Sequence, residues 1–387
     1  MGLLRTFSKV KLTKSNVLVR VDASLVMGTG HVMRCLTLAD ALTADGMSCT
    51  FVCREFAGHM CNLIETRGHK VARLPSPAVR LEDSSSNDGA GSSPTTLYAF
   101  WLGVSQADDA RDTLMVLAGG AADVVVVDHY ALGAEWESSL RAHCETILAI
   151  DDLADRDHDC DVLLDQNLGR LVTDYDGLVP LHCQRLIGPR YALLRPEFAV
   201  LRSESLARRS DGKCRHILVT MGGVDSDNAT GLVLTALESA CLAADMRVTV
   251  VLGASAPWKE SVQIQAQGMR LKTEIVVNAT NMAELMRDAD LAIGAAGSTS
   301  WERCCMGLPT LQLVLADNQR QIARALDSRG AAVSIERHRL AESIGTVCAN
   351  LLRDPRDMIA MSNAAASVTE GLGATRVAES LMRGVVA

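Results

Sequence analysis

Short apolar runs alternate along the whole chain with longer stretches in which apolar residues recur at helical spacing. The run from Val124 to Val127 is apolar throughout, which is typical of a strand covered on both faces. Alternation of this kind predicts parallel sheets flanked by helices, an α/β fold. The predicted strands are 17–21, 49–53, 71–74, 124–127, 146–150 and 162–164, then 216–221, 248–252, 274–277, 291–295, 310–314 and 332–335.

A polar and charged stretch, 195–214, separates the two groups of strands. It predicts a linker between an amino-terminal domain, 1–200, and a carboxy-terminal domain, 201–387, with a ligand cleft between them. A chain of 387 residues is long enough for two such domains. The Ser- and Gly-rich stretch 82–96 has the composition of a surface loop.

Composition narrows the function classes. Hydrophobic residues make up 48% of the chain but aromatic residues only 3%, so the cores should be aliphatic. A net charge of −8 argues against nucleic acid as a partner, because no basic stripe is available for phosphates. No apolar run approaches the roughly 18 residues of a membrane span. The basic start, 1–14, lacks the apolar stretch of a signal peptide. A cytoplasmic protein without a membrane partner is therefore expected.

The twelve cysteines are scattered and form no C-x-x-C pair, so we expect reduced thiols and no structural metal. The acidic cluster that begins at Asp151 lacks the glycine and the terminal glutamate of a calcium loop. Its members are read as turn residues. Asp152 is the best candidate for a structural bond to the backbone.

A strand, a glycine turn and a histidine follow one another at the start of the first predicted sheet. Gly28 and Gly30 suit the turn, and helical spacing begins at His31 and ends near Gly46. This places His31 at the carboxyl edge of the sheet, where open α/β folds bind ligands. Its charge changes near neutral pH, so it can act as a general base. Two other readings stay open: a plain helix-start residue, or part of a dinucleotide fingerprint that is incomplete because Met33 stands at the third glycine position.

A second strand ends in small residues and leads into a helix that carries Ser298, Thr299 and Ser300. Free N–H groups and hydroxyls at such a turn suit a phosphate. Glu302 follows, either as an acceptor for ribose hydroxyls or as part of a capping box with Thr299.

Three further motifs follow strands on the same edges. Asn318 and Gln319 can bond the hydroxyl and amide groups of a sugar, or form an ordinary helix cap. Tyr130 closes an Asp128-His129-Tyr130 motif whose two charged members can also form a local structural bond. Gly223 opens a turn after the strand 216–221, and the polar residues 225–228 behind it can simply cap the next helix.

Taken together, these motifs resemble the UDP-2,4-diacetamido-2,4,6-trideoxy-β-L-altropyranose hydrolase family of pseudaminic acid biosynthesis. The motifs that carry the resemblance are 28–36 (GTGHVMRCL), 127–130 (VDHY), 188–195 (GPRYALLR), 221–223 (MGG) and 294–302 (GAAGSTSWE). The resemblance extends from about residue 17 to the end of the chain. It implies two Rossmann-like domains in the GT-B architecture, with an interdomain cleft.

The resemblance also implies a reaction: water displaces UDP from the anomeric carbon with inversion, without metal or cofactor. His31 is then the general base, and Tyr130 lies near the sugar and the water. Ser298, Thr299 and Ser300 hold the diphosphate, Glu302 binds the ribose, and Asn318 and Gln319 contact the sugar. Gly30, Arg34 and Gly223 complete the set of substrate- and UDP-binding residues.

The residues before 17 and the length of the Ser- and Gly-rich stretch depart from the family pattern, but neither touches a motif. Two other functions stay open. A glycosyltransferase of the same architecture would move the sugar of a UDP-amino sugar to an acceptor, and a non-catalytic sensor would bind nucleotide sugars without releasing UDP. The only partner expected is a small-molecule UDP-sugar, and a monomer is favoured.

Overall fold

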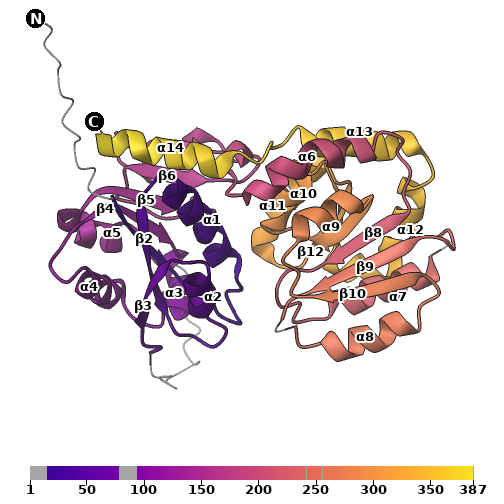
Figure 1. Cartoon of the computed structure of the whole chain (residues 1–387), viewed down its shortest axis with the longest axis horizontal. Coiled ribbons are helices and arrows are strands. Elements are labelled where there is room, and N and C mark those ends of the chain that lie inside the picture. The colour runs from indigo at the N-terminus through magenta and orange to yellow at the C-terminus, as the bar shows by residue number, and fades with distance from the viewer. Residues whose placement is uncertain (1–14, 78–93, 241, 255, 387) are drawn as a thin grey trace, which may run out of the picture.

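The protein folds into two α/β domains, as Figure 1 shows for the computed structural model. The structure describes residues 15–77, 94–240, 242–254 and 256–386. The basic start of the chain and most of the Ser- and Gly-rich stretch therefore lie outside the described residues. The end of that stretch opens a helix at Pro94.

The first domain contains a seven-stranded parallel sheet in the order β3-β2-β1-β4-β5-β6-β7. Its strands are β1 (Asn16–Val21), β2 (Ser48–Arg54), β3 (Lys70–Leu74), β4 (Ala122–Asp128), β5 (Cys144–Ile150), β6 (Val162–Asp165) and β7 (Gln184–Ile187). Its helices include α1 (Gly30–Ala44), α2 (Cys61–Thr66), α3 (Pro94–Leu102), α4 (Gln106–Leu117) and α5 (Ala134–Leu140). The short 3₁₀ helices are η1 (Arg141–His143), η2 (Val172–Tyr175) and η3 (Pro189–Tyr191).

The second domain repeats this plan with a six-stranded parallel sheet, in the order β10-β9-β8-β11-β12-β13. Its strands are β8 (His216–Thr220), β9 (Arg247–Leu252), β10 (Lys272–Val277), β11 (Leu291–Ala295), β12 (Thr310–Val314) and β13 (Val333–Glu336). Its helices are α6 (Pro196–Arg208), α7 (Ala229–Ser239), α8 (Lys259–Gln267), α9 (Met282–Asp288), α10 (Thr299–Cys305), α11 (Arg320–Ser328), α12 (Leu340–Leu351) and α13 (Pro355–Ala366), with 3₁₀ helices η4 (Asp317–Gln319) and η5 (Arg337–Arg339).

All twelve expected strands are present, and their ends lie within two residues of the expected ones. Strand β7 was not expected from the sequence. This strand has only four residues, begins with Gln184 and Arg185, and pairs on one side only, with β6. A short strand of this composition at the edge of a sheet carries no apolar run to detect it.

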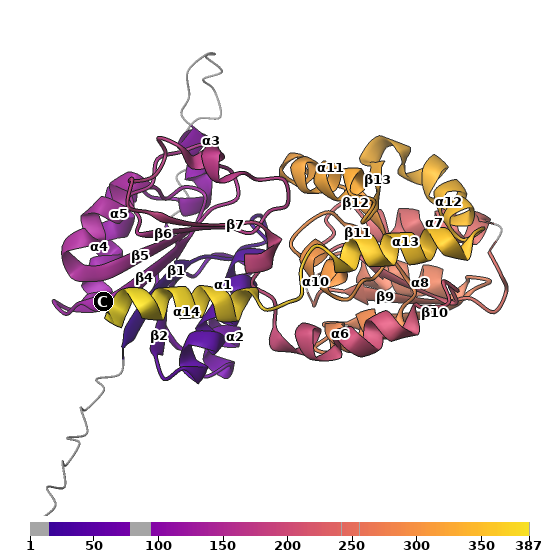
Figure 2. The same cartoon turned by 90° about the horizontal axis from the view of Figure 1, so that it is seen from above.

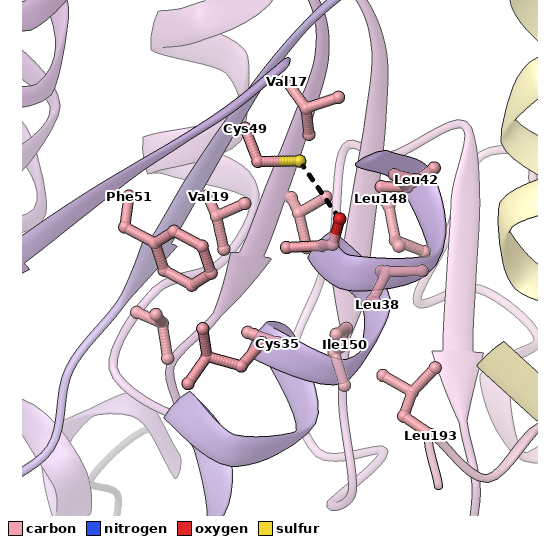
Figure 3. Packing of buried hydrophobic residues seen from close by; sticks show 14 of the residues in the cluster. Val17, Val19, Cys35, Leu38, Leu42, Cys49, Phe51, Leu148, Ile150 and Leu193 are labelled. Carbon is pink, nitrogen blue, oxygen red and sulfur yellow. Dashed lines mark hydrogen bonds between the residues drawn. The ribbon is translucent and has the colours of Figure 1, made fainter. Parts of the chain in front are cut away.

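The core of the first domain is aliphatic, as its composition implies. On one side of the sheet, Val17 and Val19 of β1 pack with Leu38 and Leu42 of α1 and with Phe51 of β2 (Figure 3). The thiol of Cys49 donates to the carbonyl of Ala39, 3.7 Å away, within the same cluster. The eleven cysteines of the described residues are all free thiols, as expected.

The last helix, α14 (Gly373–Val386), returns to the first domain. Figures 1 and 2 both show it lying along α1, away from the second sheet. Its buried residues Ala374, Val377, Ala378 and Leu381 belong to the first domain's core. The hydroxyl of Ser380 also donates to the side chain of Gln184 in β7.

The expected division into 1–200 and 201–387 therefore differs from the structure at two places. Helix α6 already packs on α9 and α10 of the second domain, and Phe198 lies in that domain's core. Helix α14, expected in the second domain, packs on the first. An amphipathic pattern shows that a helix has a face to bury, but it does not say against which sheet.

In each sheet the chain adds strands first toward one edge and then toward the other. The order reverses between β1 and β4 in the first sheet and between β8 and β11 in the second. Ligands of open α/β sheets bind outside the carboxyl ends of the strands at such a point. Among the described residues, no helix combines the length and the apolar character that crossing a membrane requires.

Candidate active site

The two domains meet at the turns that follow these strands. A methyl group built on Gly30, after β1, would lie 3.6 Å from Oγ of Ser298, after β11. One built on Gly223, after β8, would lie 3.3 Å from Oγ1 of Thr29. Residues from both carboxyl edges therefore come together in one place, which we call the interdomain site.

His31 lies in the first turn of α1 and faces a carboxylate from the neighbouring strand. Its Nδ1 atom is 2.6 Å from Oδ1 of Asp128, at the end of β4. Because a carboxylate accepts a hydrogen bond, this contact places the proton on Nδ1 and leaves the lone pair on Nε2. The Nε2 atom has no hydrogen-bonding partner among the described residues, and the side chain is 13% exposed. The helix-start reading, in which the ring only bonds a carbonyl, is not what the structure shows.

Asp128 is held in its charged form. Burial by itself would raise its pKa, but the charges of Arg34 and His31 outweigh burial and hold the pKa of Asp128 well below its usual range. Arg34 binds both carboxylate oxygens, through Nε at 2.6 Å and Nη2 at 2.7 Å. The carboxylate can therefore orient the imidazole at all ordinary pH values.

Arg34 is bound on all sides by carboxylates. Its third nitrogen, Nη1, donates to Asp152 at 2.7 Å, so every nitrogen of the guanidinium binds a carboxylate. The side chain is buried, and two acids balance its charge. Arg34 therefore holds Asp128 in place, and its predicted part in binding the substrate or UDP stays a prediction.

Tyr130 lies next to His31. The two rings meet edge to face with centroids 4.8 Å apart, and the Tyr130 hydroxyl donates to Asp152 at 3.0 Å. Burial, and then the charge of Asp152, raise the pKa of Tyr130 well above its usual range, so this hydroxyl stays protonated. Asp152 was expected to bond the backbone. Instead its carboxylate binds side chains, and Asp151 accepts the backbone N–H, from Ala154.

Two aromatic residues of α3 complete the surroundings of His31. Trp101 stacks on Tyr130 with centroids 5.6 Å apart, and Tyr98 contacts both rings. Four of the thirteen Trp, Tyr and Phe residues of the chain, Tyr98, Phe100, Trp101 and Tyr130, thus lie in one cluster at the histidine. His129, by contrast, is structural: burial lowers its pKa to about 4, and its Nδ1 accepts the N–H of Ala131.

The three hydroxyl-bearing residues at the turn after β11 differ in their exposure to solvent. Ser298 is exposed and precedes α10, so N–H groups at this turn lack intrahelical acceptors. Thr299 is partly exposed, and its hydroxyl accepts from Arg303. Ser300 is buried, and its hydroxyl also accepts from Arg303, at 3.0 Å. All three hydroxyls were expected to hold the diphosphate. Ser300 differs from the other two because its side chain is buried.

Glu302 does not form the capping box with Thr299. The helix begins after Ser298, and no side chain caps it. The carboxylate of Glu302 lies 3.7 Å from the guanidinium of Arg195 instead. Burial raises the pKa of Glu302 to about 7, against the opposing charges of Arg195 and Arg303. This carboxyl group is therefore poised to change its charge near neutral pH.

The remaining predicted residues, Gly223, Asn318 and Gln319, lie on loops of the second domain. Behind Gly223, Asp225 and Asn228 accept backbone N–H groups at the start of α7, so the capping interpretation of this segment is confirmed. The Gln319 side chain accepts the N–H of Leu315 and thus stabilises its own turn. Asn318 lies in η4, and its side chain is outside the part that the structure describes.

The contacts of Asp128, Asp152 and Arg195 were not expected from the sequence. Asp128 was expected either at a ligand site, because it ends a strand, or in a local bond with His129. Sequence spacing cannot pair Asp128 with His31, which lies 97 residues away, or Asp152 with Arg34, which lies 118 residues away. In the described residues, no cluster of three or more His, Cys, Asp or Glu side chains could hold a metal ion.

Known proteins resemble the chain both in sequence and in fold. Residues 216–378 match the family described as the glycosyltransferase family 28 C-terminal domain. A Campylobacter jejuni protein, UDP-2,4-diacetamido-2,4,6-trideoxy-β-L-altropyranose hydrolase, is 23% identical over 82% of this chain and 98% of its own length. An uncharacterised Methanocaldococcus jannaschii protein is 25% identical over 79% of this chain, which spans 57% of that protein's length.

Among solved structures, MurG of Acinetobacter baumannii superposes with a TM-score of 0.66 at 15% identity, over 95% of this chain and 99% of that one. At this identity the likeness concerns the fold, and it confirms the expected GT-B architecture of two Rossmann-like domains. The resemblance to the UDP-sugar hydrolases, expected from the motifs, is also supported over most of the chain. The chain thus has the GT-B architecture, and its second domain matches the glycosyltransferase family 28 C-terminal domain over residues 216–378.

Proposed function

We propose that the protein hydrolyses a UDP-linked 2,4-diacetamido-2,4,6-trideoxy-hexose of the L-altrose type, with inversion at the anomeric carbon. The single observation that carries this proposal is the convergence of two turns: a methyl group built on Gly30, directly before His31, would lie 3.6 Å from Oγ of Ser298. One turn brings an imidazole held by Asp128. The other brings a small-residue turn suited to a diphosphate.

In the proposed reaction, Nε2 of His31 takes a proton from a water molecule as the water oxygen forms a bond to the anomeric carbon. The bond from that carbon to the diphosphate oxygen breaks, and UDP leaves with the electron pair. A diphosphate is already a stable anion, so its departure needs little protonation, and donors at the Ser298 turn stabilise the charge that develops. The free sugar and UDP are the products, and no metal or cofactor takes part.

The remaining roles follow from the same placement. Tyr130 contacts the sugar and the water from beside His31, and Glu302 accepts hydrogen bonds from the ribose. Gly30 and Gly223 allow the two turns to approach the substrate closely. Asn318 and Gln319 lie on the rim of the second sheet, where they contact the sugar.

Hydrolysis for a pseudaminic acid-type pathway is supported by the similarity to the Campylobacter jejuni hydrolase, which extends over nearly all of that enzyme. The second candidate is a glycosyltransferase that uses a UDP-amino sugar. The match of 216–378 to a glycosyltransferase domain favours it. The two candidates differ only in the acceptor, because water replaces an acceptor hydroxyl in the hydrolase.

The test is to incubate the purified protein with UDP-diacetamido sugars in ¹⁸O-labelled water and to follow the products by NMR. We expect free sugar with ¹⁸O on the anomeric carbon, unlabelled UDP, and an inverted anomeric configuration in the first product formed. Release of UDP only after an acceptor is added would favour the glycosyltransferase. Binding without any release over hours would identify a sensor.

A further inference from the structure

Arg303 is a fully buried guanidinium directly behind the Ser298 turn. Its side chain is among the largest fully buried ones, with 1% of the residue exposed. It donates to the carbonyl of Ala295 at 2.8 Å, to the Ser300 hydroxyl at 3.0 Å and to the Thr299 hydroxyl at 3.2 Å. These three acceptors lie on both sides of the turn 296–298, so the guanidinium spans its base.

Glycine makes room for this arrangement. A methyl group on Gly294 would come within 2.6 Å of Nη1 of Arg303, closer than real Cβ atoms come to other atoms. Residue 294 therefore lacks a side chain at the point where the guanidinium passes beneath β11. The small residues of the 294–302 motif therefore leave room for the arginine below the turn as well as for a ligand above it.

The charge of Arg303 has no ion-pair partner within the described chain: all three of its acceptors are neutral oxygens. Its Nε is buried without a hydrogen bond. Burial lowers the pKa of Arg303 to about 10, against the smaller opposing effects of Cys304 and Glu302, and still leaves the group charged at neutral pH. The buried arginines of the first domain differ, because Arg20, Arg34 and Arg54 each bind a carboxylate.

An unbalanced buried charge is costly unless an opposite charge comes close to it. The exposed side of the turn is where a diphosphate lies in the proposed function, and this inference rests on that placement. We propose that Arg303 is a positioning residue for the diphosphate: its buried positive charge beneath the turn forms no ion pair in the described chain, and it gains an opposing charge when the anionic group of the nucleotide lies above it. The arginine thereby gives the site its preference for diphosphate over an uncharged nucleoside.

A purely structural arginine is the alternative, and the chain offers a matched control. Arg209 is also buried, and within the residues that the structure describes it also forms no ion pair with a carboxylate and has an unpartnered Nε. It donates to the carbonyls of Ser205, Met286, Ala289 and Met306. Met306 follows the opposite end of α10, so this arginine supports the domain away from the Ser298 turn.

The experiment measures the dissociation constants of UDP and of uridine by calorimetry and takes their ratio. The proteins are the wild type, the neutral variants Arg303→Met and Arg303→Gln, the charged variant Arg303→Lys, and the control Arg209→Met. Arg303→Gln keeps N–H donors without the charge, and it serves if the methionine variant does not fold. Thermal unfolding without ligand reports any structural cost separately.

We expect the preference for UDP over uridine to fall at least roughly tenfold in a neutral variant, because a full charge a few ångströms below the turn is removed. In Arg303→Lys it should stay within about threefold of the wild type, since the charge is kept. Arg209→Met should unfold at a lower temperature with the preference unchanged.

An unchanged preference in the folded neutral variants would overturn the inference, and so would an equal loss in Arg303→Lys. Either result would leave Arg303 as a support for the turn alone. The proposed function fails separately: a wild-type protein that binds uridine as tightly as UDP has no diphosphate site at all.

Discussion

Nδ1 of His31 lies 2.6 Å from Oδ1 of Asp128, although 97 residues separate the two in the chain. One residue begins the helix after β1 and the other ends β4, the strand next to it in the sheet. The pairing gives the imidazole a defined tautomer and a free Nε2. It turns a histidine at a helix start into a candidate general base.

His31→Ala should lower kcat at least roughly 10²-fold with little change in KM, because a positioned base contributes about 10²–10⁴-fold and acts mainly in the transition state. UDP release from the diacetamido sugar measures it. His182→Ala is the control, since His182 lies on the surface with its side chain 62% exposed. Turnover near that of the wild type would remove His31 from the mechanism.

Asp128→Asn should lower kcat at least roughly tenfold, because an amide neither fixes the Nδ1 proton nor stabilises the imidazolium that forms. It should also destabilise the fold at pH 7 by about 3 kcal/mol, since Arg34 then keeps only Asp152 as a charged partner. Urea unfolding and UDP release on the same samples separate the two effects. A variant with full activity would show that the tautomer does not depend on Asp128.

The stability difference between wild type and Asp128→Asn should shrink in acid. The folded-state pKa of Asp128 lies well below the unfolded value of about 3.9. Its contribution is therefore fully present above that unfolded value and is lost as the pH falls below it. Urea unfolding at pH 7, 5 and 3.5 checks the trend. A difference that stays constant over this range would contradict the assigned ion pairs.

Glu302→Gln should weaken UDP binding and remove a proton release that accompanies it. With its pKa raised to about 7, Glu302 is partly protonated in the free protein, whereas ribose hydroxyls donate best to the charged form. Calorimetry at pH 6.5 in buffers of different ionisation enthalpy measures the protons released. The terminal phosphate of UDP titrates in both proteins, so their difference isolates Glu302. Equal affinity and equal proton release would exclude the ribose contact.

Glu302 also predicts a pH trend in the stability of the ligand-free protein. Its folded-state pKa of about 7 lies above the unfolded value of about 4.3. Its contribution to stability is therefore complete below about 4.3 and is lost as the pH rises through 7. Glu302→Gln should therefore gain stability relative to the wild type between pH 5 and 8. Thermal unfolding without UDP over this range is the measurement, and parallel curves for the two proteins would contradict it.

Leu381→Ala should destabilise the first domain by about 2–5 kcal/mol, the usual range for a large side chain removed from a core. Leu381 of α14 is fully buried in that core, although it stands near the end of the chain. Leu372→Ala is the matched control because Leu372 is 46% exposed, and it should change stability by less than about 0.5 kcal/mol. Equal effects of the two changes in urea unfolding would mean that α14 does not hold the first domain together.

Local patterns predicted the strands well, because a parallel strand buried on both faces is an uninterrupted apolar run, as in Val124–Val127. They also placed His31 and Ser298 at the starts of helices, since glycine turns mark those points. They failed for β7 and for the placement of α14. A short edge strand has no apolar signal, and the choice of partner for an amphipathic helix is not a local property.

The amino-acid sequence by itself determined two parallel sheets and the turns at their carboxyl edges, because both depend on the order of apolar, glycine and polar residues within a few positions. Only the tertiary structure decided which side chains meet there. The bonds of Asp128 to His31 and to Arg34, the contact of Gly30 with Ser298 and the burial of Arg303 join segments through space. Such contacts follow from how strands are ordered and how domains pack, and no spacing in the chain encodes them directly.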